Sequence, residues 1–258
     1  MSAPQDSPHW SAKAAPTARP TGVGCWRRTL DVVSAGMGLA LLAPLLATIA
    51  LVIVLTSSGP VLFRQTRLTG GRREFMILKF RTMRVNQGGP QITATGDVRI
   101  TAVGGLLRRT HLDELPQLVN VLRGDMTLVG PRPETPALAA RYPQECQWVL
   151  EHRPGLTGPT QVRPQDLNDI PVGVLDPEQW YLEHLVPQRV VMDATYLDLP
   201  TVAATIGVLI DTAGHLIGSG AKRSREVKRP LTASPNRKYL MRLVLGSLSR
   251  TSKSSNRN

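Results

Sequence analysis

A chain of 258 residues with a net charge of +12 is long enough for one good hydrophobic core, or for one domain with tails. The positive charge favours a polyanionic partner, but eleven of the 31 Lys and Arg residues, against one Glu, lie in residues 222–258. The rest of the chain is therefore close to neutral, and with aromatic residues at only 4% the composition argues against a nucleic-acid-binding domain.

The N-terminal part of the chain divides into a polar tail and an apolar segment. Residues 1–25 are rich in Ser, Ala, Pro and Thr without apolar periodicity, so we expect them to be disordered. Residues 32–55 contain no charged side chain, and these 24 residues are enough to cross a bilayer as a helix. The segment is too long and too far from the N-terminus for a signal peptide. We therefore predict a membrane helix over residues 26–56.

Two features of this helix favour a helix–break–helix that enters the bilayer and returns on the same side. Pro44 lies at its centre, where it removes a backbone donor and bends or breaks a helix. Basic residues flank both ends, Arg27 and Arg28 before it and Arg64 and Arg67 after it, and basic flanks prefer the cytoplasmic side. Proline-kinked spanning helices are also common, so these features leave both the re-entrant and the spanning arrangement open.

Residues 57–217 are expected to form one mixed α/β domain, mostly helical with few strands. The strands are predicted at 59–67 and 73–83, around a turn at Gly70-Gly71, and a polar loop follows at 85–99. Apolar residues at helical spacing predict a helix within residues 108–133 that ends near Gly124. Further helices are predicted over three segments, 137–151, 177–196 and 201–217.

Two adjacent carboxylates, Asp113 and Glu114, stand at the start of this helix, next to Arg108 and Arg109. The helix dipole and both arginines are expected to keep Asp113 ionised. An ionised carboxylate can attack phosphorus, while Glu114, about a quarter-turn away, can bind a hard cation. A divalent ion would offset the charge of a diphosphate and steady the leaving group. The same pair also fits a plain helix cap.

Three further cations are candidates for binding phosphate. Lys79 and Arg81 alternate with apolar residues in LKFRTM, so a strand would point both the same way, as a phosphate clamp requires. They fit a solvated strand face equally well. Arg132 lies between two prolines, a stiff arrangement that suits anion positioning and also occurs in plain loops. The chain contains no P-loop, no GxGxxG and no zinc pattern.

An ordered series of motifs runs from about residue 26 to about residue 212. It comprises RRTLDVVSA before an apolar segment with a central proline, then GPVLFRQTR, LKFRTM, LRRTHLDELPQLVNVLRGDMTLVGPRPE and RPGLTGPTQV. Each motif is weak by itself, but the complete series is specific. The chain resembles the bacterial sugar transferases, the monotopic polyprenyl-phosphate phosphoglycosyl transferases.

The resemblance implies a re-entrant helix broken at Pro44 and a cytoplasmic catalytic domain whose amphipathic helices lie on the inner leaflet of the bacterial cytoplasmic membrane. It implies transfer of a sugar phosphate from a UDP-sugar to polyprenyl (undecaprenyl) phosphate, which initiates exopolysaccharide or glycoconjugate synthesis. Asp113 would be the nucleophile that expels UMP, and Glu114 would support Mg²⁺. The expected phosphate-binding residues are Lys79, Arg81, Arg108, Arg109 and Arg132.

The chain departs from the family pattern at several points. Ala43 precedes the membrane proline where Ser is common, and His111 stands where a small residue is common. The segment after RPGLTGPTQV is also unusual, which leaves the choice of sugar open. Two other functions remain as alternatives: a catalytically silent membrane scaffold with the same fold, or a basic nucleic-acid-binding protein.

The C-terminal tail, residues 218–258, is basic, and we expect it to be disordered. Residues 237–250 alternatively fit a short basic amphipathic helix that binds anionic lipid of the inner leaflet. The sequence does not decide which sugar is transferred, which pathway uses it, or whether the protein is a homodimer.

Overall fold

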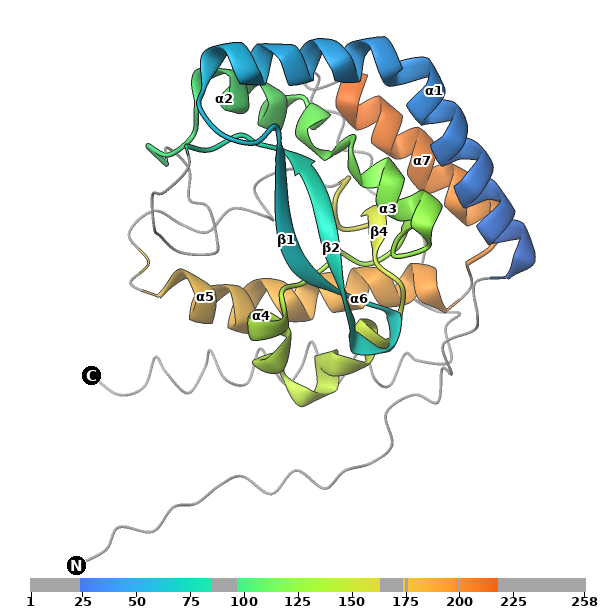
Figure 1. Cartoon of the computed structure of the whole chain (residues 1–258). Helices are drawn as coiled ribbons and strands as arrows, with labels where there is room; N and C mark the ends of the chain where they lie inside the picture. Colours follow the sequence, from blue (N-terminus) through green and yellow to red (C-terminus); the bar gives the residue numbers. More distant parts are fainter. Residues whose placement is uncertain (1–23, 85–96, 163–173, 175, 199, 218–258) are drawn as a thin grey trace, which may run out of the picture.

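The structure is a computed structural model that describes residues 24–84, 97–162, 174, 176–198 and 200–217. The predictions for the two tails and for most of the polar loop concern residues outside this set. Within it the protein has the mixed α/β, mostly helical architecture expected from the sequence (Figure 1).

The apolar N-terminal segment forms one helix, α1 (Cys25–Thr56), which contains Pro44. Figure 1 shows that α1 is bent near its middle and so borders the molecule on two sides. A bend is expected there because proline has no amide hydrogen for the preceding turn and its ring crowds the carbonyl four residues earlier. The prediction of a helix that breaks at Pro44 is wrong in this respect, since the helix continues through the proline.

The two predicted strands are present as an antiparallel hairpin. Strand β1 (Leu62–Thr69) pairs with β2 (Arg73–Phe80) along their full length, and the short turn η1 (Gly70–Arg72) joins them. Gly71 has φ 70, a left-handed conformation that glycine adopts without a Cβ clash. The hairpin crosses the middle of the molecule in Figure 1.

The segment that carries the acidic pair is divided into three pieces. Helix α2 (Ala102–Arg109) ends before His111, whose φ of 55 turns the chain out of the helix. A single 3₁₀ turn, η2 (Leu112–Glu114), follows, and α3 (Gln117–Arg123) begins after Pro116. The predicted helix is confirmed over residues 117–123, but its expected first turn, with Asp113 and Glu114, is a separate 3₁₀ turn, because Pro116 has no amide to continue the hydrogen bonding. The predicted end at Gly124 is confirmed, and this residue has φ 88.

The second half of the domain adds two short parallel strands and a set of helices. Strands β3 (Thr127–Val129) and β4 (Gly155–Thr157) were not predicted, because three residues give too short a pattern. The helix predicted at 137–151 is instead two pieces, interrupted at Pro143. The predictions at 177–196 and 201–217 are confirmed. The helical elements are α4 (Pro136–Ala140), η3 (Gln144–Glu151), α5 (Pro177–Trp180), the π-helical turn η5 (Tyr181–Leu185), α6 (Val186–Leu197) and α7 (Val202–Ile217).

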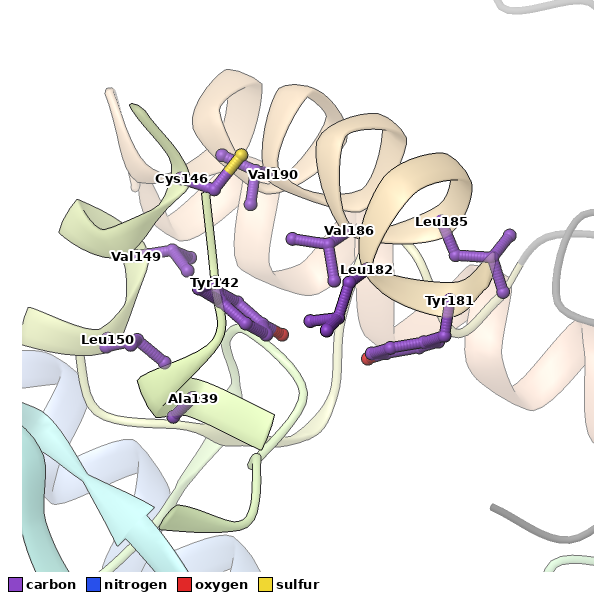
Figure 2. Close-up of a cluster of buried hydrophobic side chains, with 10 residues drawn as sticks. All are labelled: Ala139, Tyr142, Cys146, Val149, Leu150, Tyr181, Leu182, Leu185, Val186 and Val190. Carbon is purple, nitrogen blue, oxygen red and sulfur yellow. The ribbon is translucent and has the colours of Figure 1, made fainter. Parts of the chain in front are cut away.

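Apolar side chains form three buried clusters. One lies between η3 and the η5–α6 helix, and Figure 2 shows Tyr142 and Tyr181 within it with their hydroxyl ends facing each other. A second joins Ala35 of α1 to the hairpin, α3 and β3. A third packs Ile49 and Ile53 of α1 against the end of β2 and against α2. The outer side of α1 remains exposed, with Leu41 73% and Leu55 75% accessible.

The first turns of α1 are bound to the domain by polar contacts. Arg28 donates two hydrogen bonds of 2.6 Å to the carbonyls of Val121 and Leu122, at the end of α3. Asp31 is 2% exposed, and its Oδ1 accepts hydrogen bonds from Thr127 Oγ1 at 3.0 Å and from the Leu128 amide at 2.8 Å. The N-terminal part of this apolar helix is therefore a fixed part of the folded domain.

The far end of α1 is bound to the same domain. Arg81, directly after β2, donates to the carbonyls of Ser57 and Ser58 at 2.7 and 2.8 Å. These carbonyls follow the last turn of α1, where the helix dipole favours a cation. Both ends of the helix thus contact one folded unit.

Candidate functional site

Four segments that are separate in the sequence converge on the acidic pair. Turn η2 supplies Asp113 and Glu114, and β2 supplies Lys79, whose Nζ lies 2.6 Å from Glu114 Oε1. Helix α2 supplies Arg108, whose charge acts on Asp113. The loop after β3 supplies Arg132, whose charge acts on Glu114. Two carboxylates and three cations therefore form one charged cluster.

Asp113 is the most enclosed member of the cluster, at 8% exposed. Burial, together with the neighbouring charge of Glu114, raises the pKa of Asp113 to about 6, against the opposing effect of Lys79 and Arg108. The prediction that flanking cations keep Asp113 ionised is therefore incomplete, because desolvation raises the pKa of Asp113 more than the cations lower it. At neutral pH the carboxylate form still predominates, and it is poorly solvated, which suits a nucleophile.

Glu114 has the opposite character. Burial acts to raise its pKa, but Lys79 and Arg132 outweigh this effect and lower the pKa to about 2. Glu114 is therefore anionic throughout the physiological pH range. Two neighbouring carboxylates with pKa values pushed apart are typical of sites where the two groups have different roles.

Two further residues position members of the cluster and carry no reacting group. His111, with φ 55, makes the turn that separates η2 from α2 and sets the direction in which Asp113 emerges. Thr82 accepts a 2.8 Å hydrogen bond from Arg108 Nε, which fixes the guanidinium beside Asp113. A non-glycine residue at positive φ cannot be read from sequence, and strain of this kind is concentrated at functional sites.

The structure does not bring Arg81 and Arg109 into the cluster. Arg81 is 6% exposed and binds the end of α1, as described above. Arg109 is exposed on the last turn of α2, and the cations that act on Asp113 are Lys79 and Arg108. The predicted alternation of side chains along the strand does not place Arg81 beside Lys79, because β2 ends at Phe80.

A small open pocket lies beside Glu114. Lys79, Glu114 and Arg132 line it together with Arg67 and Gln117, neither of which was predicted as a site residue. Arg67 Nη1 donates at 3.0 Å to the carbonyl of Pro133, so it also holds the loop that presents Arg132. The motif letters contain both residues, but only the fold shows that they face the pocket.

A buried polar network lies behind the Arg132 loop. The hydroxyl of Tyr181 donates a short hydrogen bond to Glu134 Oε1, and Arg189 Nη1 donates to the same hydroxyl at 2.8 Å. Tyr181 belongs to the π turn η5, which precedes Pro187, and such turns are frequent at functional sites. Glu134 and Arg189 of this network line a second small cavity, together with Asp193.

Asp193 makes stability depend on pH. It is 4% exposed, and burial raises its pKa to about 7, against the opposing charge of Arg189. A carboxyl whose folded-state pKa lies above its unfolded value stabilises the fold at low pH, and this contribution is lost as pH rises through about 7. We expect the melting temperature to fall as the pH rises from about 4 to about 7 and to level off above that, and Asp193→Asn to flatten this dependence. An unchanged slope in the variant would contradict this assignment.

The acidic pair fits a divalent cation of the kind that phosphate chemistry uses. The described residues contain no group of three or more His, Cys, Asp or Glu that could enclose a metal. Mg²⁺ does not need such a cage, since it is usually held by one or two carboxylates with substrate phosphates and water. Glu114, anionic and at the pocket, is the suitable ligand.

Comparison with known proteins identifies the family of this chain. Residues 23–219 match the family described as bacterial sugar transferase. A UDP-glucose:undecaprenyl-phosphate glucose-1-phosphate transferase of Caulobacter vibrioides is 52% identical over 143 residues, which are 53% of this chain and 53% of that protein. The protein of the same name from Escherichia coli K12 is 44% identical over 141 residues, 53% of this chain and 30% of its own length.

The name of a third relative contains a different sugar. The UDP-N-acetylgalactosamine-undecaprenyl-phosphate N-acetylgalactosaminephosphotransferase of Aeromonas hydrophila is 42% identical over 141 residues, 53% of this chain and 33% of that protein. The matched region thus spans about a third to a half of the length of these relatives. The family match, by contrast, covers most of this chain. The chain therefore belongs to the bacterial sugar transferase family.

Proposed function

We propose that this protein transfers a sugar phosphate from a UDP-sugar to undecaprenyl phosphate and so initiates exopolysaccharide or glycoconjugate synthesis. The observation that carries the proposal is the buried Asp113 set among Lys79, Arg108 and Arg132, beside an anionic Glu114. The names of the relatives supply the substrate class, UDP-sugar and undecaprenyl phosphate.

In the first step Asp113 attacks the phosphorus that is bonded to the sugar. A bond forms between the carboxylate oxygen and this phosphorus, and the bond to the oxygen of UMP breaks, so that UMP leaves with the electron pair. No proton is required for departure, because a phosphate monoester is a stable anion near neutral pH. Lys79, Arg108 and Arg132 would neutralise the phosphoryl oxygens as charge shifts.

In the second step a phosphate oxygen of the lipid attacks the same phosphorus. The bond to Asp113 breaks and the carboxylate is restored, which gives a two-step, ping-pong route to a polyprenyl diphosphate sugar. The low exposure of Asp113 limits access of water to the covalent intermediate. Glu114 would hold Mg²⁺, which, when bound, offsets the charge of the diphosphate.

The activity is tested by UMP release from a panel of UDP-sugars, with undecaprenyl phosphate and Mg²⁺. We expect release from at least one sugar and loss of release on addition of EDTA. A protein that releases no UMP from any donor, while still inserting in membranes, would favour the alternative of a catalytically silent scaffold.

We also propose that α1 is re-entrant, with the domain on the cytoplasmic side. Support comes from the contacts of Arg28 and Asp31 at one end and of Ser57 and Ser58 at the other, all made with one folded unit. A helix that crossed the bilayer would carry its two ends to opposite sides, and these contacts could not form together.

The topology is tested by labelling with a membrane-impermeant maleimide. Cys25 is exposed at the start of α1, Thr56 is exposed at its end, and Cys146 is buried. We expect both Cys25 and Thr56→Cys, the latter in a Cys25→Ser background, to label in inside-out vesicles and neither to label in intact cells. Labelling of one of the two positions in intact cells would establish a spanning helix.

A further inference from the structure

The first residue of α3, Gln117, has an unusual environment. Its side chain is 2% exposed, and it lines the small pocket beside Glu114 together with Lys79 and Arg132. Its amide nitrogen, Nε2, is buried and has no hydrogen-bond partner among the described residues. Buried polar atoms are nearly always bonded, so an unbonded donor in a side chain that lines a pocket calls for a partner from outside the chain.

A second buried donor belongs to Arg67, which lines the same pocket. Arg67 Nε lacks a hydrogen-bond partner among the described residues, although Nη1 and Nη2 of the same guanidinium are bonded to Pro133 and Gln65. Both unbonded atoms donate, so the matching ligand atom is an acceptor. A phosphoryl oxygen accepts only, whereas a sugar hydroxyl would also present a proton.

Asn120, one turn further along α3, shows that a buried amide in this helix can be fully bonded. Its Nδ2 donates at 2.8 Å to the carbonyl of Met76, and its Oδ1 accepts at 3.0 Å from the amide of Leu78. Asn120 therefore ties α3 to β2, and its bonds are internal to the fold. Gln117 Nε2 has no comparable partner within the described part of the chain. The amide of Asn120 therefore holds the fold together, whereas that of Gln117 is placed for a ligand.

We propose that Gln117 is a substrate-binding residue, whose Nε2 donates a hydrogen bond to a phosphoryl oxygen of the bound substrate, with Arg67 Nε as a second donor. This inference rests on the proposed function, because it takes the pocket to hold a phosphorylated substrate. A neutral amide binds such an oxygen beside Glu114 without adding a further charge. The phosphoryl oxygen belongs either to the UDP-sugar or to the lipid phosphate, and the two half-reactions distinguish these sources.

The test is Gln117→Met, which keeps the length of the side chain and removes the donor. We expect the KM for the substrate that Gln117 contacts to rise about tenfold to a hundredfold, since a hydrogen bond to a charged group is lost. A rise confined to the UDP-sugar places the bond in the first half-reaction, and a rise confined to undecaprenyl phosphate places it in the second. Unchanged KM values for both substrates would overturn the proposal.

Thermal stability provides the readout that separates binding from structure. Gln117→Met removes an unsatisfied buried donor, so its melting temperature should equal the wild-type value or exceed it by about 2–4 °C. The matched control, Asn120→Leu, breaks the internal hydrogen bonds to Met76 and Leu78 and a longer one to Asp125, and should melt at a lower temperature. A fall for Gln117→Met as large as that of Asn120→Leu would show a structural role and overturn the proposal.

A ligand-binding measurement tests this inference independently of the proposed activity. UDP with Mg²⁺ and undecaprenyl phosphate are each expected to raise the melting temperature of the wild type. The ligand whose phosphoryl oxygen Gln117 contacts should raise the melting temperature of Gln117→Met and Gln117→Glu much less. If the wild type released no UMP, the proposed function would fail while this comparison still tested Gln117. Equal stabilisation of all three proteins by each ligand, together with unchanged KM values, would overturn the inference alone.

Discussion

Asp113→Asn is expected to reduce UMP release at least about a thousandfold, because the amide cannot replace the carboxylate as nucleophile. The substitution is nearly isosteric and neutral, at a position where burial already disfavours charge and raises the pKa to about 6. The fold should therefore keep its thermal stability and its membrane association. The measurement is UMP release with the donor sugar identified from the panel, with melting temperature recorded for the same preparations.

The control for this experiment is Asp211→Asn, which removes a carboxylate from the exposed side of α7. It should leave UMP release at the wild-type rate.

A radiolabelled sugar phosphate from the donor should remain bound to the wild-type protein when the lipid acceptor is omitted, and should not bind to Asp113→Asn. Turnover by the Asp113→Asn variant near the wild-type rate would rule out Asp113 as the nucleophile.

The largest loss of stability is expected from Asp31→Leu. Asp31 is 2% exposed and accepts hydrogen bonds from both Thr127 and Leu128, so a leucine leaves two buried donors without an acceptor. We expect the free energy of unfolding to fall by about 2–4 kcal/mol, and the melting temperature by about 5–10 °C. Thermal unfolding in detergent or nanodiscs measures this change.

Two milder substitutions test the cause of that loss. Asp31→Asn keeps the acceptor oxygen and should cost less than Asp31→Leu. Thr127→Val removes one of the two donors and should cost about 1 kcal/mol. A melting temperature for Asp31→Leu equal to that of the wild type would show that the contact between α1 and β3 contributes little to stability.

The hairpin and the helices of the second half illustrate what local patterns predict well. The strands at 62–69 and 73–80 and the helices ending at Leu197 and Ile217 follow from periodicity over many residues. The short strands β3 and β4 could not be predicted, since three residues in each carry no period and pair only through the fold. The helix expected around Asp113 fails for a related reason, because the positive φ of His111 is decided by packing.

The sequence by itself determined the family, the apolar segment with its central proline, and the acidic pair. It also predicted five candidate phosphate-binding cations: Lys79, Arg81, Arg108, Arg109 and Arg132. These features depend on residue identity and order along the chain. Only the tertiary structure decided that Arg81 caps α1, that burial raises the pKa of Asp113, and that Gln117 and Arg67 face the pocket. The reason is physical: desolvation, hydrogen-bond partners and the direction of a side chain depend on segments that are distant in sequence and meet only on folding.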